Sequence, residues 1–284
     1  MNNFINETEW NNEEGMWIHV LNKEEQESSF DSAQADEIRR YEDVSWWYTY
    51  RKQFIHMICR EFMDEGKMLV DVGGGNGLVA GYLKKQGYDT SLIEPSHASC
   101  RYAIERGVSN VYCGTVGDSS IKNEAFEQVM LLDVLEHIED DKAFYKMMLD
   151  KMASGGRLLI TVPAFMKLWS SEDVGSGHYR RYKAEDIRRI ADEVGGKVIF
   201  ENYFFSFLYY PVLLGRVLFE KIGIIKPLDK RNEKEYAKER DRQYTNNSRL
   251  VAGVLTHFEK REMKKALKKR LKHGSSLVVI IEKE

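Results

Sequence analysis

The chain has 284 residues, of which 43% are hydrophobic and 31% are charged, and its formal net charge is −3. This length suits one α/β domain with additions or two small domains, and the near balance of charge identifies no partner. Three scattered cysteines, Cys59, Cys100 and Cys113, form no CxxC pair. This pattern suggests neither a zinc site nor a disulfide framework and favours a reducing cytoplasm. The polar, acidic stretch Met1–Trp17 lacks the apolar centre of a signal peptide.

Residues 1–45 are predicted to form an irregular or partly helical extension. A helix over Ser45–Met63 follows, because aromatic and aliphatic residues recur there at helical spacing. Beyond it, apolar strands are predicted at Lys67–Val72, Thr90–Ile93, Asn110–Cys113, Gln128–Leu132, Arg157–Val162 and Lys197–Asn202. Helices are predicted between them at Leu78–Gln86, Ser96–Arg106, Asp140–Met152 and Ala184–Val194. This alternation predicts a doubly wound, mostly parallel α/β sheet that binds ligands at the carboxyl ends of its strands.

The remainder of the chain is predicted to be mainly helical over 203–273, with a last strand at Ser276–Glu282. We therefore divide the chain into an extension (1–66), a core (67–202), a helical insertion or substrate lid (203–273) and a final core strand (274–284). The apolar stretch Tyr203–Phe219 is too short and interrupted for a membrane span of about 20 residues. It is expected to cover a pocket or the core; the alternative is a patch for a lipid-like substrate or for peripheral membrane contact.

The basic segment 259–272 holds eight basic and two acidic residues. Such a run could indicate nucleic acid, but no interleaved aromatic residues support that reading. We therefore expect a solvated helix face and no nucleic-acid partner.

A glycine-rich loop follows the first core strand, with Gly73, Gly75 and Gly77 in a GxGxG pattern. Residues without Cβ let the backbone turn sharply against a ligand, and the next helix points free N–H groups at it. Glu94 ends the following strand, where its carboxylate can accept two hydrogen bonds from ribose hydroxyls. A dinucleotide site would have a third glycine where this chain has Leu78. The acidic Asp71 before the loop also suits a cationic amino-acid ligand better than a pyrophosphate.

These features resemble the class I S-adenosylmethionine (SAM)-dependent methyltransferases, which have a Rossmann-like, seven-stranded sheet. The similarity lies in LVDVGGGNG at 69–77, LIEPS at 92–96, VMLLDVLEHIED at 129–140 and GGRLLITVPAF at 155–165. The resemblance implies that Asp71 receives the methionine amino group, that Glu94 holds the ribose and that Leu132 and Asp133 lie beside the methionine. Val116 falls near the expected adenine contact, although the acid that precedes it in relatives is absent or displaced to Asp118. The other cofactor positions implied by these motifs are Gly73, Gly74, Gly75, Asn76, Gly77, Pro95 and His137.

An aromatic stretch before the core, Trp46–Arg51, resembles the aromatic-rich helix of many relatives. By that similarity Arg51 would pair with the SAM carboxylate, and Tyr48 would close over the cofactor. Trp47 is placed at the substrate side of the site. The alternative is ordinary packing of a capping helix on the sheet.

The segment VPAFMKLWSSEDVGSGHYRRYKAEDI at 162–187 resembles a bacterial subgroup (type 11/12/23-like) of these methyltransferases with a GH-x-RRY loop. An oxygen or ammonium acceptor must lose a proton, and His178 has the chemistry of a general base, with Asp173 as its orienting partner. The alternative for this loop is anchoring to the sheet. The further candidate substrate contacts are Phe165, Trp169, Arg180, Arg181, Tyr203 and Tyr209.

The sequence thus predicts a cytoplasmic enzyme that methylates an O or N atom of a small molecule, glycan or lipid-linked metabolite, as a monomer or homodimer. SAM is the expected cofactor and S-adenosylhomocysteine the product. The seven histidines are scattered without an HxxxH pair, so no metal site is expected. The alternatives are an NAD(P)-dependent reductase and a non-catalytic SAM-binding or partner-binding protein.

Overall fold

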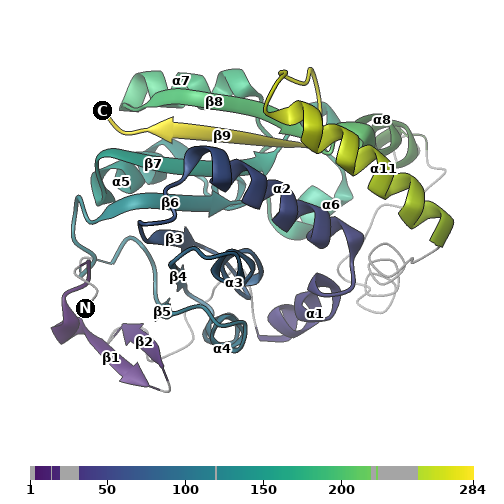
Figure 1. Cartoon of the computed structure of the whole chain (residues 1–284). Coiled ribbons are helices and arrows are strands. Elements are labelled where there is room, and N and C mark those ends of the chain that lie inside the picture. The colour runs from purple at the N-terminus through teal and green to yellow at the C-terminus, as the bar shows by residue number, and fades with distance from the viewer. Residues whose placement is uncertain (1–3, 14, 20–31, 119, 219–221, 223–248) are drawn as a thin grey trace.

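The computed structural model describes residues 4–13, 15–19, 32–118, 120–218, 222 and 249–284. Its centre is a nine-stranded sheet with the strand order β1-β2-β5-β4-β3-β6-β7-β9-β8 (Figure 1). The strands are β1 (Trp10–Glu13), β2 (Met16–His19), β3 (Leu69–Val72), β4 (Thr90–Glu94), β5 (Asn110–Cys113), β6 (Phe126–Leu132), β7 (Met152–Pro163), β8 (Lys197–Phe204) and β9 (Ser276–Glu282). Only β1 and β9 run antiparallel to their neighbours in the sheet.

The α-helices are α1 (Ser32–Glu42), α2 (Trp46–Phe62), α3 (Leu78–Lys85), α4 (His97–Glu105), α5 (Asp141–Lys151), α6 (Ser171–Ser176), α7 (Ala184–Val194), α8 (Tyr209–Val212) and α11 (Arg249–Ala266). Shorter turns are η1 (Glu7–Glu9), η2 (Leu135–His137), η3 (Met166–Leu168), η4 (Ser206–Leu208) and the π-helical η5 (Leu213–Leu218). Side chains cap several helices: the Ser45 hydroxyl accepts from the Trp47 amide at the start of α2, and Asp140 accepts from Ala143 at the start of α5.

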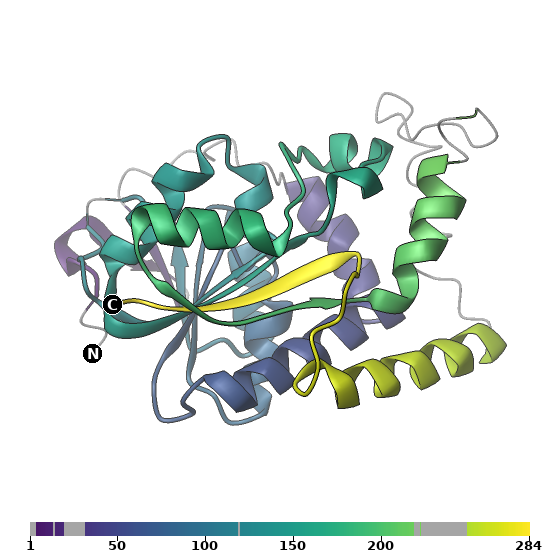
Figure 2. The same cartoon turned by 90° about the horizontal axis from the view of Figure 1, so that it is seen from above.

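Helices cover both faces of the sheet, as Figure 2 shows from above. Phe54 of α2, Val79 of α3 and Ala266 of α11 belong to one apolar cluster with β3, β6 and β9. Tyr145 of α5 and Ile187 of α7 belong to another cluster with the opposite face. Since β3 to β8 are mutually parallel, their carboxyl ends lie along one edge of the sheet, where the prediction places the ligand site.

The predicted α/β class is confirmed, and every predicted core strand and helix is present, with boundaries that differ by a few residues. The predicted seven strands correspond to β3–β9, in the order β5-β4-β3-β6-β7-β9-β8. The strand β7 starts earlier than predicted because Met152 already pairs with Phe126. The division of the chain into an extension, core, lid and final strand stays a prediction. Residues 219–221 and 223–248 of the expected lid lie outside the described residues.

The N-terminal extension departs from the prediction, because part of it forms a hairpin that adds two strands to the sheet. Gly15 turns the chain with φ +85°, and β2 then pairs in parallel with β5. The polar run before the turn hid this strand, but Trp10 is buried and its indole donates to the Ser120 hydroxyl at 2.9 Å. The extension is also partly helical, as predicted, because it contains α1.

A buried carboxylate joins α11 to the body of the protein. Glu262 accepts hydrogen bonds from the amides of Phe205 at 2.7 Å and Ser206 at 2.6 Å, and from the Tyr50 hydroxyl at 2.5 Å. The Ser206 hydroxyl donates to it as well. One side chain thereby ties α11, the end of β8 and α2 together. Among the described helices, none is long and apolar enough to cross a bilayer.

Replacing Glu262 with alanine is expected to destabilise the fold by roughly 3 kcal/mol, because two buried amides and a tyrosine hydroxyl lose their acceptor. Urea unfolding followed by circular dichroism measures the effect. Glu259→Ala on the same helix is the matched control and is expected to cost less than about 1 kcal/mol. Equal losses in the two variants would contradict the anchoring role of Glu262.

Candidate cofactor and active site

The glycine loop joins β3 to α3 at the carboxyl edge of the sheet. Gly75 and Gly77 adopt left-handed backbone angles, with φ of +54° and +68°. A Cβ on Gly77 would lie 2.6 Å from the Cβ of Ala103, so α3 and α4 leave no room for a side chain there. A Cβ on Gly75 would meet no atom within 4 Å. The loop therefore packs tightly against α4 at Gly77 and exposes its backbone to open space at Gly75.

Asp71 lies beneath this loop, at the end of β3. Its side chain is 1% exposed, and neither carboxylate oxygen has a hydrogen-bond partner among the described residues. Burial raises the pKa of Asp71 to about 7; the charge of Arg51 opposes this shift and that of Glu94 adds to it. A buried carboxylate without a partner is costly unless a cation or donor completes it. The amino group of a methionine moiety is a ligand of this kind.

Glu94 ends the neighbouring strand β4 and is also buried. Its carboxylate accepts hydrogen bonds from the amides of Gly75 and Ser96, each at 3.0 Å. Burial raises the pKa of Glu94, and these two amides counteract the shift. A carboxylate has about four acceptor positions, so Glu94 can brace the loop and still accept from vicinal hydroxyls. The two carboxylate acceptors, Asp71 and Glu94, and the open backbone at Gly75 thus fit SAM.

Arg51 on α2 reaches the same edge and forms an ion pair with Asp133 at 2.8 Å. Asp133 has φ +59°, a strained angle for a residue with a side chain, and its other oxygen accepts from the Thr161 hydroxyl at 3.0 Å. The structure therefore brings two predicted cofactor residues together. The expected pairing of Arg51 with the SAM carboxylate stays a prediction.

The other predicted cofactor residues lie around this edge in different roles. The Asn76 side chain donates to the carbonyl of Ala35 at 2.9 Å and so ties the loop to α1. Asp118 accepts from the amide and hydroxyl of Thr115, which closes the turn that contains Val116. Val116 and Leu132 are buried, whereas Tyr48 and Pro95 are half-buried. Their predicted contacts with the cofactor stay predictions.

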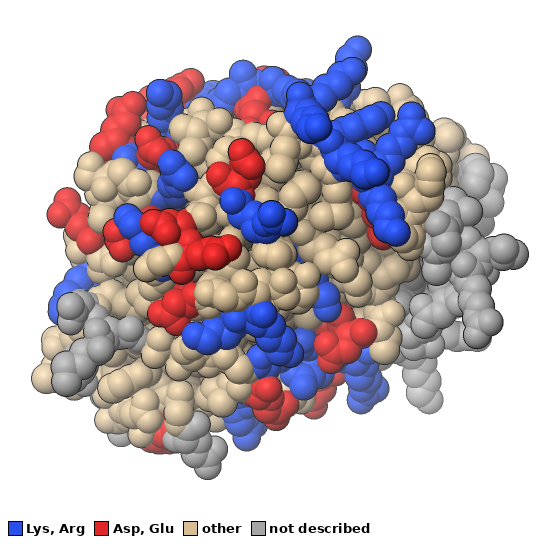
Figure 3. Space-filling view, in the orientation of Figure 1, with Lys and Arg blue, Asp and Glu red and all other residues tan. Residues whose placement is uncertain are grey.

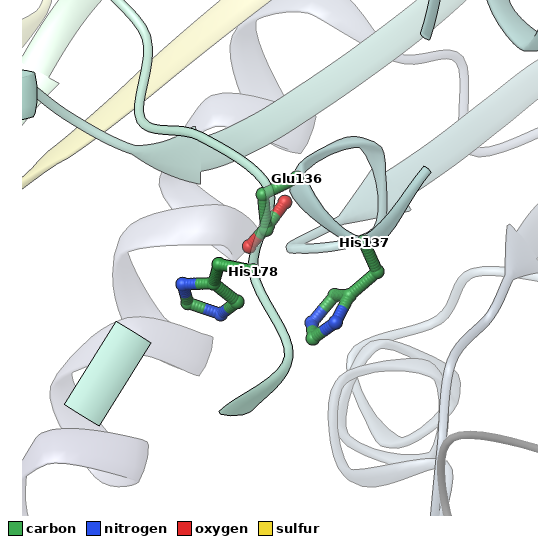
Figure 4. A group of neighbouring side chains, drawn as sticks. All are labelled: Glu136, His137 and His178. Atoms are coloured by element: carbon green, nitrogen blue, oxygen red, sulfur yellow. The ribbon is translucent and has the colours of Figure 1, made fainter. Parts of the chain in front are cut away.

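A second buried carboxylate, Glu136, lies in η2 beyond β6. Its side chain is 0% exposed, and its oxygens have no hydrogen-bond partner within the part of the chain that the structure describes. Burial, and then the charge of Asp133, raise the pKa of Glu136 well above its usual range. Figure 4 shows Glu136, His137 and His178 facing one another. The sequence did not single out Glu136, since burial of its carboxylate cannot be read from the Leu135–His137 motif.

One nitrogen or oxygen atom from each of Glu136, His137 and His178 lies within 4.8 Å of the others. Two imidazoles and a carboxylate are ligands that zinc or iron accepts, although bonds of about 2 Å would require side-chain movement. The expectation that the chain holds no metal rested on linear spacing, which cannot indicate this grouping. It stays a prediction.

His178 follows α6 and is held by Asp173, with 2.9 Å between its Nδ1 and the carboxylate. Asp173 is buried and also accepts from the Arg181 guanidinium at 2.7 Å and from the Ser170 amide at 2.9 Å. Burial raises the pKa of Asp173, but its bonds with His178 and Arg181 outweigh this and lower it overall. The carboxylate therefore stays ionised and orients the imidazole.

The two arginines predicted at the substrate side both have protein partners. Arg181 pairs with Asp173, and Arg180 pairs with Asp141 at 2.8 Å and donates to the Glu139 carbonyl. These contacts favour the anchoring alternative for the RRY part of the loop. Tyr182 supports it too, because its hydroxyl donates to Asp141 at 2.9 Å.

The predicted aromatic substrate residues divide into two groups at the same edge. Phe165 stacks on Tyr203 at 4.7 Å and meets Tyr209 edge-on at 5.6 Å. Trp47 instead stacks on Phe205 at 5.4 Å, a residue that sequence reasoning missed. Like Asp133, both Phe165 and Phe205 have positive φ, so strained residues follow β6, β7 and β8 alike. Trp169 is half-buried, and its predicted substrate contact stays a prediction.

Comparison with known proteins assigns the class. A family model described as a methyltransferase domain matches residues 46–200, more than half of the chain. The chain therefore belongs to the methyltransferase-domain family, and its fold and motifs are those of the class I SAM-dependent enzymes. SAM is accordingly its cofactor, as predicted, and the reductase alternative is not favoured.

Two curated relatives carry the name ubiquinone biosynthesis O-methyltransferase. The chain is 26% identical to that of Rickettsia canadensis over 151 residues, which cover 46% of this chain and 64% of the relative. It is 29% identical to that of Paramagnetospirillum magneticum over 117 residues, which cover 39% of this chain and 47% of the relative. The chain thus matches less than two thirds of the length of either relative.

The solved structures that share the fold include two at 17% identity. One is phosphoethanolamine N-methyltransferase 2 of Haemonchus contortus in complex with SAM, with a TM-score of 0.53 over 90% of this chain and 58% of the other. The other is a SAM-dependent methyltransferase of Thermotoga maritima, with a TM-score of 0.55 over 89% of this chain and 97% of the other. At this identity the similarity shows the fold alone.

The raised pKa of Asp71 leads to a pH-dependent prediction. The unfolded chain ionises this carboxyl near its usual value of 3.8, whereas the folded protein without cofactor keeps the proton up to about 7. Between these values the folded state binds more protons, so its stability contribution falls as pH rises, by up to about 1.4 kcal/mol per pH unit. Asp71→Asn removes that loss, and thermal melts across this pH range measure it.

The same carboxyl must be ionised to pair with an ammonium group. SAM affinity measured by calorimetry is therefore expected to rise severalfold from about pH 6 to about pH 8 in the native protein and to stay flat and weak in Asp71→Asn. Affinity that does not change with pH, or tight binding by the variant, would exclude this role for Asp71.

Proposed function

We propose that this chain transfers the methyl group of SAM to an O or N atom of a small-molecule, glycan or lipid-linked acceptor. The observation that carries the proposal is the Asp173–His178 pair, placed at the same sheet edge as the buried Asp71 and Glu94. An oxygen acceptor is favoured, because the curated relatives are named O-methyltransferases. Bound SAM would supply an electrophilic methyl group on sulfur, and the protein must supply everything else.

The protein's first task is to remove a proton from the acceptor. Because Asp173 is ionised, it accepts the Nδ1–H of His178 and fixes the tautomer in which Nε2 is unprotonated. That nitrogen can take the acceptor proton, and the carboxylate stabilises the imidazolium that results. Arg181 and the Ser170 amide hold Asp173 in place.

The second task is to orient the acceptor and exclude water. Phe165 and Trp47 belong to the aromatic groups along this edge and are only half-buried, so they can contact an apolar acceptor. The half-buried aliphatic and aromatic residues of η4, α8 and η5 support the proposed lid over residues 203–273 and a peripheral membrane contact there. We further propose a cytoplasmic monomer or homodimer; the three free, buried cysteines support that location.

His178→Ala is expected to lower methyl transfer by roughly 100-fold or more while SAM affinity changes by less than about twofold. Formation of S-adenosylhomocysteine with a library of hydroxy and amino acceptors measures turnover, and calorimetry measures affinity. Asp173→Asn should lower turnover and shift the pH profile, whereas Tyr179→Phe, at the exposed neighbouring position, should change neither.

Unchanged turnover in His178→Ala would remove this residue from the mechanism. If no acceptor is methylated although SAM binds tightly, the non-catalytic alternative would be favoured.

A further inference from the structure

The exposed face of α11 and the turn after it carry a dense positive charge. Figure 3 shows the lysine and arginine side chains gathered over this helix. The cations, all exposed, are Lys260, Arg261, Lys264, Lys265, Lys268, Lys269, Arg270 and Lys272. The two acidic residues of this segment do not offset them on the surface, since Glu262 is buried and Glu259 is half-buried.

Most of these cations also have no counter-charge among the residues that the structure describes. Within the described ranges, Arg270 is the one member of the set that forms an ion pair, at 2.7 Å from Glu201. Four lysines elsewhere do pair: Lys67 with Glu127, Lys84 with Asp89, Lys142 with Glu193 and Lys146 with Asp150. Unpaired like charges on one helix face repel each other, so this face is suited to an external anionic surface.

Two adjoining hollows extend the charge beyond the helix. One, of about 450 Å³, is lined by Arg261, Lys265 and Lys272 together with Phe207 and Phe258. The other, of about 440 Å³ beside β8, is lined by Arg188 and Lys268 and also by Glu201, which pairs with Arg188 at 3.1 Å. Both are lined by Lys269 and Arg270 as well, so the cationic surface is continuous across the helix and the following turn.

Apolar side chains border this surface. Phe258 on α11 and Leu267 directly after the helix are 44% and 36% exposed. Tyr210 at the start of α8 packs against His273, 5.1 Å between ring centroids, and is followed by the exposed Leu214 and Leu218. In Figures 1 and 2 the start of α8 lies beside the turn after α11. Cations bordered by exposed aliphatic and aromatic residues match the interfacial region of a bilayer better than the sugar-phosphate backbone of a nucleic acid.

We propose that α11 and the turn to Lys272 form a docking surface for anionic phospholipid membranes. The lysines meet lipid phosphates, and the bordering apolar residues enter the headgroup region. The surface lies on a different element from Asp71, Glu94 and His178, so the proposal does not depend on the identity of the methyl acceptor. α11 and this turn are the last part of the proposed lid over 203–273, so the docking surface specifies the peripheral membrane contact proposed for that segment.

Flotation of the full chain with vesicles tests this docking. Phosphatidylcholine vesicles with about a quarter phosphatidylglycerol should bind the protein roughly tenfold or more tightly than pure phosphatidylcholine, and about 0.5 M salt should abolish the difference. The test variant changes Lys264, Lys265, Lys268 and Lys269 to glutamine. It should bind anionic and neutral vesicles equally weakly.

The matched control changes the four paired lysines Lys67, Lys84, Lys142 and Lys146 to glutamine. It removes the same charge and should bind vesicles within about twofold of the native chain. Both variants should keep SAM affinity, which reports folding and the cofactor site separately from docking. Equal loss in both variants, equal binding to neutral vesicles, or tighter binding to a single-stranded oligonucleotide than to the anionic vesicles would overturn the proposal.

Discussion

Burial of the Asp71 carboxylate is the constraint around which the cofactor site is arranged. Its two oxygens lie under the glycine loop without a hydrogen-bond partner among the described residues. A Cβ on Gly74 would lie 2.6 Å from one of those oxygens, so the loop closes directly over the carboxylate. The fold therefore tolerates a destabilising group at this point, as proteins commonly do where a ligand supplies the missing partner.

Strained backbone angles occur at the same edge of the sheet. Asp133, Phe165 and Phe205 follow three parallel strands, and each has a left-handed backbone angle that glycine adopts more easily. Hydrogen bonds hold at least two of them: the Asp133 amide donates to Thr161 and the Phe165 amide to Tyr182. The turn at Asp133 positions its ion pair with Arg51 at the end of β6. The turns at Phe165 and Phe205 position the two aromatic groups beside it. These strained turns destabilise the fold locally, whereas the apolar clusters on both faces of the sheet stabilise it.

The local part of the site could be predicted from the sequence. The glycine loop, Asp71 and Glu94 lie within one β-α-β unit, so their arrangement follows from strand ends and short turns. The pairing of His178 with Asp173 was predictable for the same reason, since five positions separate them. The core strands and helices followed from hydrophobic periodicity, which is strong in buried parallel sheets.

Features that depend on long-range contacts were not predictable. Arg51 meets Asp133, and Glu136 meets His178, only because the strands bring distant segments to one edge. The strands β1 and β2 were missed because Asn11 and Asn12 interrupt any apolar alternation, and their burial comes from β5 and Ser120. The basic face of α11 was visible as composition, but the absence of counter-charges required the fold.

The central claim is that the unpartnered Asp71 and the loop-bound Glu94 together hold SAM. A crystal structure with S-adenosylhomocysteine tests it most directly. The account predicts the homocysteine amino group within hydrogen-bond reach of Asp71, directly or through one water, and the ribose hydroxyls on Glu94. A ligand that lies elsewhere, with the Asp71 oxygens still without a partner, would contradict it.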